Sequence, residues 1–304
     1  MSGRVVVVGS LNLDLVIALE RMPDSGETVF GERLDQHAGG KGLNQAVAAV
    51  RLGSTVSMIG ALGDDSAGEF LRGIVTSEGI DDTGIASVAG TSGTAVIEVD
   101  ASSANRIVVI PGANDAVTAE HVTATIAELT DVAVVLTQGE VPIAAIEAAM
   151  AAGRARGAAT ILNPAPVRDY PDSVYANVDV VIPNEHEAAH LTGLPTDTAV
   201  DAIEAARALV ARGAGCAVIT RGGRGAVWAT RTSTGHAPAF EVTPIDTVAA
   251  GDAFCGGLTT ALAEGLDLPV AIRWASAAGA LATTVAGAVP SLPRREAVET
   301  LVAS

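Results

Sequence analysis

The segment Asp246–Phe254, DTVAAGDAF, places small residues and a carboxylate at the start of a predicted helix. Ala249, Ala250 and Gly251 let backbone N–H groups approach an anion closely, and a helix N-terminus favours negative charge. Asp252 would then stand in the first helical turn, beside a bound phosphate. A carboxylate there is suited to take the proton from a hydroxyl that attacks the phosphate. The alternative is a simple helix cap, for which aspartate is a preferred residue.

A second segment suited to ligand binding is the glycine-rich run GGKGLNQAVAAVRLG, which begins at Gly39 and leads into a predicted helix. Such a turn brings the backbone close to a polar ligand, and Lys41 and Asn44 can point into the same site. The run is not a nucleotide-binding P-loop. Gly42, rather than serine or threonine, follows Lys41, and Asp35 stands at the first glycine position. A plain tight turn is the remaining alternative.

Asn12 and Asp14 lie in GSLNLD, residues 9–14, directly after the first predicted strand. In an extended segment, residues two apart point the same way, so these two side chains share one face. An amide and a carboxylate together can donate to and accept from neighbouring hydroxyls, as a vicinal diol requires. An Asx-type turn after the strand is the alternative.

Two shorter motifs carry weaker signals. HEAAH fits the zinc-protease pattern, but no third ligand stands at a suitable spacing, so we predict that His186 and His190 are ordinary helix residues. TRGGRGAVW at 220–228 predicts two strands joined by a glycine turn. Such a turn can follow the face of a nucleotide, with Thr220 or Arg224 near its phosphates. An ordinary hairpin is the alternative.

The composition indicates a globular protein with a large core and an acidic surface. Of the 304 residues, 49% are hydrophobic and 17% charged, and the formal net charge is −17. This balance argues against nucleic acid as a partner, because phosphate contacts need clustered lysine and arginine. No run approaches the ~18 apolar residues of a membrane span and no signal-peptide pattern is present, so we expect no membrane partner. Cys216 and Cys255 stand in apolar surroundings and are expected as buried thiols in a reducing cytoplasm.

Apolar β-branched runs alternate with alanine-rich helical patterns along the chain, which predicts a mainly parallel sheet covered by helices on both faces. The strands are expected at 4–9, 55–61, 132–137, 159–162, 179–182, 216–220 and 225–229. The helices are expected at 41–52, 66–78, 118–128, 142–156, 184–192, 198–211, 250–264 and 269–285.

Two regions contain strand patterns without a helix of their own. Residues 12–37 hold two such patterns around a PDSG turn, and residues 93–110 predict a hairpin around the polar ASSAN loop. We expect them to pair into a small sheet that lies over the main one as a lid. No linker divides the chain, so residues 1–304 are expected to form one domain.

The order and spacing of these segments resemble those of the ribokinase-like (PfkB-type) carbohydrate kinases. The matching motifs are GSLNLD, GGKGLNQAVAA, GDD at 63–65, PGAN at 111–114, NPAP at 163–166, PNEHE at 183–187, TRGGRG at 220–225, DTVAAGDAF and AGAVPSLP at 286–293. The likeness covers essentially the whole chain, and GGKG-x-NQA and DT-x-AAGD are together very specific. It implies a three-layer α/β/α fold with a small β-sheet lid, and phosphoryl transfer from ATP to a sugar.

The resemblance also implies roles for particular residues. Asp252 would be the catalytic base, and the backbone amides of Ala249, Ala250, Gly251 and Asp252 would hold the transferred phosphoryl group. The sugar would contact Asn12, Asp14, Gly40, Lys41, Asn44, Glu140 and Asp252. The nucleotide would be lined by Asn184, Thr220, Arg221, Gly222, Gly223, Arg224, Gly225 and Gly251, with Ser276 near adenine.

Two cations and a homodimer follow from the same resemblance. Asn184 and Glu187 occupy the family's N-x-x-E position, which orders Mg²⁺ and its waters around the phosphates. The positions that surround a monovalent cation, K⁺, some of them through main-chain oxygens, are Asp246, Val248, Ala282, Val285, Gly287 and Ser291. The lid strands correspond to those that close over the sugar and pair two subunits.

The favoured activity is phosphorylation of D-ribose at O5 by ATP, giving D-ribose 5-phosphate. Another sugar or nucleoside kinase, such as a fructokinase or adenosine kinase, is the alternative. Adenosine sites usually have more aromatic residues, whereas the lid positions Ala95, Ile97 and Val109 are aliphatic. A catalytically silent sugar-binding regulator is a further alternative, against which the intact base and NEHE motif argue. Leu43 and Gly139 depart from common family patterns, which leaves room for an altered specificity.

Overall fold

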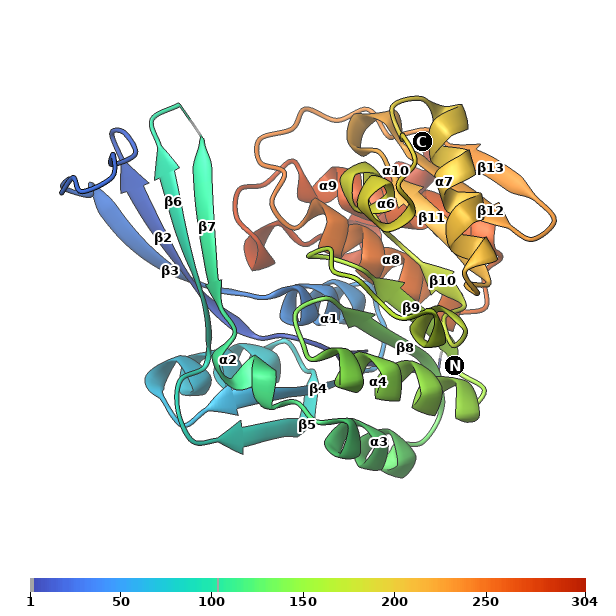
Figure 1. Ribbon diagram of the computed structural model, residues 1–304, viewed down its shortest axis with the longest axis horizontal. Helices are drawn as coiled ribbons and strands as arrows, with labels where there is room; N and C mark the ends of the chain where they lie inside the picture. The colour runs from blue at the N-terminus through green and yellow to red at the C-terminus, as the bar shows by residue number, and fades with distance from the viewer. Residues whose placement is uncertain (1–2, 103) are drawn as a thin grey trace.

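The computed structural model describes residues 3–102 and 104–304, so the first two residues and Ser103 of the predicted ASSAN loop lie outside the described residues. A nine-stranded sheet crosses the molecule in the order β13-β12-β11-β10-β9-β8-β1-β4-β5 (Figure 1). In that order its strands are Thr234–Ala237, Ala226–Thr230, Cys216–Thr220, Val180–Val181, Ala159–Asn163, Val132–Gln138, Arg4–Val8, Val56–Gly63 and Asp81–Val88. Neighbours run parallel from β11 to β5, and β12 and β13 are added antiparallel.

Helices cover both faces of this sheet, which confirms the predicted three-layer α/β/α architecture. One layer holds α1 (Lys41–Arg51), α2 (Ser66–Ser77), α8 (Ala250–Ala263), α9 (Leu268–Ala282) and α10 (Arg295–Ala303). The opposite layer holds α3 (Ala119–Glu128), α4 (Ile143–Ala155), α5 (Asp172–Tyr175), α6 (Glu185–Thr192) and α7 (Ala199–Ala211). In β1, Val5 and Val7 face the first layer while Val6 and Val8 face the second, which explains the unbroken apolar run.

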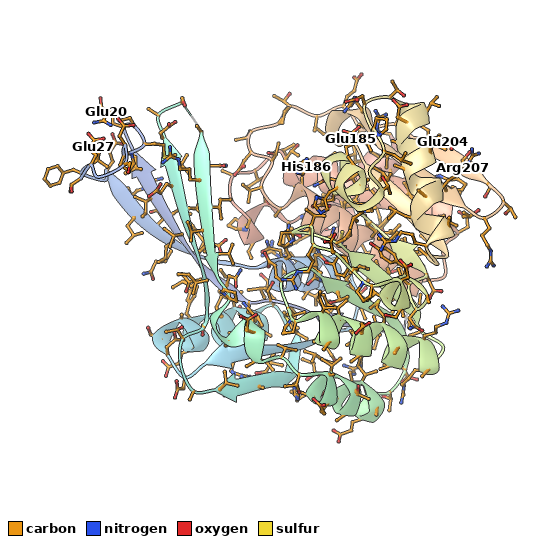
Figure 2. All side chains as sticks on the ribbon, viewed as in Figure 1. Glu20, Glu27, Glu185, His186, Glu204 and Arg207 are labelled. Atoms are coloured by element: carbon orange, nitrogen blue, oxygen red, sulfur yellow. The ribbon has the colours of Figure 1, made fainter. Side chains whose placement is uncertain are left out.

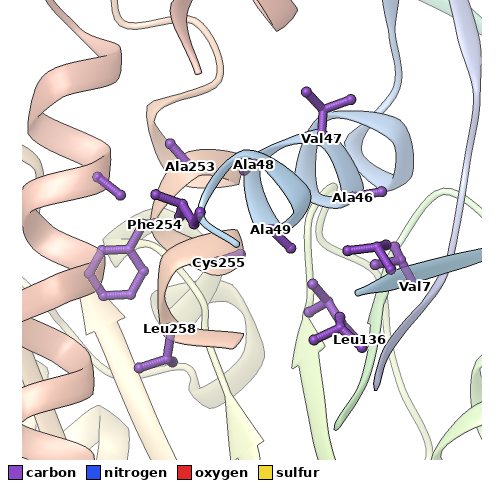
Figure 3. Close-up of a cluster of buried hydrophobic side chains, with 14 of the residues drawn as sticks. Val7, Ala46, Val47, Ala48, Ala49, Leu136, Ala253, Phe254, Cys255 and Leu258 are labelled. Atoms are coloured by element: carbon purple, nitrogen blue, oxygen red, sulfur yellow. The ribbon is translucent and has the colours of Figure 1, made fainter. Parts of the chain in front are cut away.

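The contact between α1 and α8 matters most for the site (Figure 3). Ala48 and Ala49 of α1 meet α8 beside Cys255, where the glycine at position 256 has no side chain to hold the helices apart. A Cβ at Gly256 would lie only 2.5 Å from the Cβ of Ala48. The small residues of both helices therefore allow the close approach that brings their N-terminal ends together.

A separate four-stranded sheet has the order β3-β2-β6-β7 and stands apart from the main layers on the left of Figure 1. Its strands are β3 (Arg33–Gly39), β2 (Asn12–Leu19), β6 (Gly93–Asp100) and β7 (Asn105–Ile110). β6 and β7 form the expected antiparallel hairpin, and β2 pairs antiparallel with β3 and parallel with β6. This confirms that the two helix-free regions form a small sheet of their own.

Several elements differ from the sequence-based expectation. β5, β13, α5 and α10 were not predicted, nor were the 3₁₀ turns Gly112–Ala116, Gly222–Arg224 and Val289–Ser291. The helix expected at 269–285 ends at Ala282, because the carbonyl of Thr283 accepts the backbone N–H groups of Ile245 and Asp246. Within the described residues, no helix has both the length and the apolar character needed to cross a membrane.

Candidate active site

The predicted polar residues gather at the carboxyl-terminal edge of the parallel strands, where ligands bind in open α/β sheets. Asn12 follows β1, Glu140 follows β8, Asn184 follows β10, and Thr220 ends β11. A bridge between Asn184 and Thr220 continues the pairing beyond β10 and β11. The small sheet begins at this same edge, because β2 starts at Asn12.

Asp252 stands in the first turn of α8, as predicted, and is 6% exposed. Its Oδ2 accepts a hydrogen bond from Nδ2 of Asn44 at 3.0 Å, and its Oδ1 accepts one from Nε2 of Gln45 at 2.9 Å. Ala249, at the N-cap, has a φ of 60°, a left-handed conformation that is uncommon outside glycine, and no side chain caps this helix. A Cβ at Gly251 would meet only open space. The helix thus presents backbone N–H groups and a carboxylate to the same space.

That space is a cavity of about 230 Å³. Of the predicted residues, its walls include Lys41, Asn184, Glu187, Thr220, Ala249, Gly251 and Asp252. The walls also include Asn163, Ala165, Ile182, Thr247 and Cys255, which the sequence reasoning had not assigned to a site. The phosphate-end residues expected from three distant segments therefore line one cavity.

The predicted sugar-binding residues form a cluster rich in carboxylates next to Asp252. Burial, reinforced by the nearby charges of Glu140 and Asp252, raises the pKa of Asp14 to about 7. Oε2 of Glu140 accepts hydrogen bonds from the Ser10 hydroxyl at 2.5 Å and from the backbone N–H of Lys41 at 3.0 Å. Glu140 thereby ties the end of β1 to the start of α1.

Lys41 supplies the compensating positive charge. The carboxylate of Asp252 is the largest influence that raises the pKa of the Lys41 ammonium, and the charges of Glu140 and Glu187 act in the same direction. Burial acts against them and is outweighed. Lys41 is therefore held charged by carboxylates of both the predicted sugar-binding cluster and the cavity wall.

Asn12 is 2% exposed and is oriented by a residue that the sequence reasoning did not assign, Asn114 of the PGAN motif. Nδ2 of Asn114 donates to Oδ1 of Asn12 at 2.7 Å, and its Oδ1 accepts from the backbone N–H of Leu11 at 3.0 Å. Gly40, also a predicted sugar contact, has a φ of 89°, and a Cβ there would lie 2.9 Å from the backbone nitrogen of Asn12. The glycine is required for both reasons.

Asn184 and Glu187 form a reciprocal capping box at the start of α6. Oδ1 of Asn184 accepts from the Glu187 N–H at 2.8 Å, and Oε2 of Glu187 accepts from the Asn184 N–H at 2.8 Å. Burial raises the pKa of Glu187 despite this hydrogen bond. The second carboxylate oxygen stays available to the cavity, so the pair can cap the helix and still offer an oxygen ligand.

Glu185 and His186 lie beside Glu187 on α6 (Figure 2). Glu185 accepts from Nε of Arg221 at 2.7 Å and from Nη2 of Arg224 at 2.6 Å, and both arginines also donate to the carbonyl of Asp197. The Gly222–Arg224 turn and Gly225 are thus tied to α6. His190 lies 3.7 Å from the Asp169 carboxylate and outside the cavity walls.

The residues expected around K⁺ come from two segments that the structure brings together. Oδ1 of Asp246 accepts from the Val248 N–H at 3.0 Å, and Oδ2 accepts from the Gly287 N–H at 2.8 Å. Ser291 is buried and donates to the Ala288 carbonyl, Ala282 is buried, and Val285 is about half exposed. Ser276, expected near adenine, donates to the Ile272 carbonyl within α9.

The strand register places aliphatic residues on the same face of the small sheet as Asp14. Asp14 pairs with Ala95, which pairs with Val109, and the next residues on this face are Ile97 and Ile107. The face that begins at the sugar-binding cluster is therefore apolar farther along the sheet.

The two departures from family patterns have structural reasons. Leu43 is fully buried in the core that includes Val7 and Leu136. Gly139 donates its N–H to the Ala165 carbonyl at 2.8 Å, and a Cβ at this position would collide with the carbonyl of Pro166. Both positions therefore pack the scaffold around the site.

Three polar residues that support the site were missed by sequence reasoning: Gln45, Asn114 and Asn163. Each is less than 8% exposed. Each also belongs to a motif that the sequence analysis quoted, NQA, PGAN and NPAP. The sequence feature that could have identified them is an amide side chain within an otherwise apolar or turn-forming segment. Such an amide, once buried, requires a hydrogen-bond partner.

The geometry agrees with comparisons to known proteins. The sequence model of the pfkB family of carbohydrate kinases matches residues 2–295. The chain is 37% identical over 297 residues to the ribokinase of Haemophilus influenzae, covering 97% of each chain. It is also 37% identical over 294 residues to the deoxyribokinase of Salmonella typhimurium, covering 96% of each.

Among solved structures, the ribokinase of Arabidopsis thaliana complexed with ribose and ATP superposes with a TM-score of 0.90. Its sequence is 28% identical, and the match covers 99% of both chains. The family pattern, the curated relatives and the fold all agree over nearly the full length. The protein therefore belongs to the pfkB family of carbohydrate kinases.

Proposed function

We propose that this enzyme transfers the terminal phosphoryl group of ATP to O5 of D-ribose, with Asp252 as the general base. The observation that carries the proposal is the Asp252 carboxylate at the uncapped N-terminus of α8, on the wall of the 230 Å³ cavity. The relatives named ribokinase and the ribokinase solved with ribose and ATP favour this substrate pair.

The chemistry follows from the proposed arrangement. Asp252 accepts the proton of the sugar hydroxyl as that oxygen bonds to the terminal phosphorus of ATP, and ADP leaves with the electrons of the broken P–O bond. The backbone N–H groups of Ala249 and Gly251 stabilise the negative charge of the transferred group. The N–H of Ala250 donates to the Thr247 carbonyl at 3.3 Å, and it would have to leave that bond to join them. Asn12, Asp14, Asn44 and Glu140 hold the sugar hydroxyls, and Lys41 neutralises charge between the two ends.

Two cations fit the oxygen-rich donor groups present. Glu187 offers a carboxylate oxygen to the cavity, with Asn184 beside it, a suitable set for Mg²⁺ with its waters, which would neutralise phosphate charge. Asp246 and the main-chain oxygens of 282–291 would hold K⁺, which would fix the loop before α8. The turn from Thr220 to Gly225 would contact the nucleotide, with Ser276 near adenine.

We also propose a cytoplasmic homodimer that associates through the small sheet acting as a lid. The exposed aliphatic side chains of β7 support the association, since Ile107, Val108, Val109 and Ile110 are 46–61% exposed. The buried thiols of Cys216 and Cys255 fit a reducing compartment.

2-Deoxyribose is the second candidate substrate, because a deoxyribokinase is as similar in sequence as the ribokinase. A site that hydrogen-bonds a hydroxyl discriminates strongly against a substrate that lacks it.

The test is a coupled assay of ADP release with ribose, 2-deoxyribose, fructose and adenosine, each with and without K⁺. We expect the highest kcat/KM for ribose and a higher kcat with K⁺. A preference for another sugar would overturn the ribose assignment alone, and equal rates without K⁺ would overturn the potassium site alone.

A further inference from the structure

A chain of buried amides ends on the carboxylate of Asp252. The Ile182 carbonyl accepts from Nδ2 of Asn163 at 2.8 Å, and Oδ1 of Asn163 accepts from Nε2 of Gln45 at 2.9 Å. The same Nε2 donates its second hydrogen to Oδ1 of Asp252 at 2.9 Å. Gln45 is fully buried, so water does not reach the two bonds that it donates, and Asn163, on the cavity wall, is only 7% exposed.

The Ile182 carbonyl, at the end of this series of hydrogen bonds, determines which group donates and which accepts in each of them. A peptide carbonyl only accepts, so Asn163 must turn its amide nitrogen toward Ile182 and its oxygen toward Gln45. Gln45 must then present its nitrogen to Asn163 and, with the second hydrogen, to Asp252. The Ile182 peptide is itself held by a bond from its N–H to the Leu162 carbonyl at 2.8 Å.

We propose that Gln45 is a positioning residue for phosphoryl transfer, which holds Oδ1 of Asp252 so that Oδ2 faces the sugar hydroxyl. The inference rests on the proposed role of Asp252 as the base. Asn44, the other donor to this carboxylate, is 6% exposed and bonds to Oδ2, the oxygen that must receive the proton. Gln45 has no access to substrate and bonds only to the opposite oxygen, so it can keep its bond throughout the reaction.

The change Gln45→Met keeps the length of the side chain and removes both donors. Hydrogen bonds to charged groups are strong enough that kcat should fall about 10- to 100-fold. Ribose affinity should change less than threefold, because the predicted sugar contacts remain. The matched control is Thr260→Val, at a fully buried residue of α8 whose hydroxyl contacts Ser54 and the Ala49 carbonyl rather than Gln45 or Asp252. Its kcat should stay within about threefold of the unchanged enzyme.

A double-mutant cycle separates action through Asp252 from general damage. In an Asp252→Asn background, Gln45→Met should lower kcat no further, because the base is already absent. An additive loss in the double variant, or a kcat within threefold in Gln45→Met alone, would overturn the role of Gln45. Full activity in Asp252→Asn would instead overturn the proposed base, so the two failures are distinguishable.

The dependence of kcat on pH distinguishes a positioning role of Gln45 from a merely structural one, because loss of a structural contact alone would leave the shape of the pH profile unchanged. Loss of an N–H donor disfavours the ionised carboxylate, so the acid limb of kcat should move to higher pH in Gln45→Met. The groups facing Asp252 from other elements and from α8 itself, Lys41, Asp14, Glu187 and Cys255, are unchanged in the variant. If Gln45→Met does not fold, Gln45→Glu replaces it. Its added carboxylate should depress kcat increasingly as the pH rises, and an unchanged profile would refute the proposal.

Discussion

At the scale of single residues, Asp252 combines two requirements that usually conflict. It is nearly buried and lies close to Asp14, yet its proposed role as the base requires it to be ionised. Two amide donors and the nearby ammonium of Lys41 offset that repulsion. The neutral amides of Asn44 and Gln45 therefore hold the Asp252 carboxylate, and the Lys41 ammonium balances the negative charge of the carboxylates around it.

Replacing Asp252 with asparagine preserves size and removes the proton acceptor. General-base catalysis is worth about 10²–10⁴-fold, so kcat should fall by that factor. Equilibrium binding of ribose should change little, since Asn12, Asp14 and Lys41 remain. Calorimetry of ribose binding beside steady-state kinetics makes the distinction. A kcat within a few-fold of the original, or a parallel collapse of binding, would exclude this residue as the base.

Asp14 should make the empty enzyme less stable as the pH rises. Its pKa is about 7 in the folded protein against 3.8 in the unfolded chain, so between these values the folded state binds more protons. The free energy of unfolding therefore falls from about pH 4 to pH 7, by ~4 kcal/mol at most. Asp14→Asn removes this penalty and should raise Tm by several degrees at pH 8 and little at pH 4.

Thermal unfolding without sugar at the two pH values tests this expectation. Asp24→Asn is the control, because Asp24 is exposed on the segment that joins β2 to β3. The ionised carboxylate is also the better acceptor for sugar hydroxyls, so Asp14→Asn should weaken ribose binding as it stabilises the protein. An equal Tm change at both pH values would show that Asp14 does not carry the pH dependence.

At the scale of elements, sequence periodicity was sufficient for the helices and strands that carry the site, but it missed β5, β13, α5 and α10. Residues 41–52 and 250–264 were predicted as helices, and α1 and α8 lie within those bounds. β5 was missed because it lies at the sheet edge and mixes polar with apolar residues. The contact of Gln45 with Asp252 spans 207 positions, and nothing in local sequence indicates such a pairing.

The turn after β8 should tolerate no side chain at Gly139, because it packs against the loop that follows β9. A Cβ there would collide with the Pro166 carbonyl and lie 2.9 Å from the Tyr170 hydroxyl. Gly139→Ala should lower the free energy of unfolding by about 1–3 kcal/mol, as overpacking usually does. Gly73→Ala is the matched control, because a Cβ at this exposed position in α2 meets nothing within 4 Å.

The control should be stabilised by about 0.5–1 kcal/mol, the advantage of alanine over glycine inside a helix. Urea unfolding of the three proteins measures both effects. If Gly139→Ala is as stable as the unchanged protein, the loop adjusts without cost. The glycine would then have to be explained by sugar specificity, and a changed preference in the substrate panel would be its signature.

At the scale of the whole molecule, the small sheet gives the protein an uneven shape. The small sheet projects from the main layers (Figure 1). The main layers bury their apolar residues, whereas β7 of the small sheet exposes apolar side chains on both faces. Glu20 and Glu27 lie near its outer end (Figure 2). The sequence predicted these strands from apolar runs around the PDSG turn and the ASSAN loop, but the exposure of both faces follows only from their position beyond the main sheet.

This exposure leads to the prediction for assembly. Ile107 and Val108 are adjacent in β7, so they lie on opposite faces of the small sheet and are 56% and 61% exposed. The proposed homodimer should bury at least one of these faces, and a charge there would be desolvated without a partner. Light scattering should therefore find a dimer for the unchanged protein and a monomer for Ile107→Glu or Val108→Glu. Val200→Glu, on α7 at 69% exposure, should remain dimeric. A dimer that survives both β7 changes would assemble through another surface, and a monomeric unchanged protein would contradict the proposed homodimer.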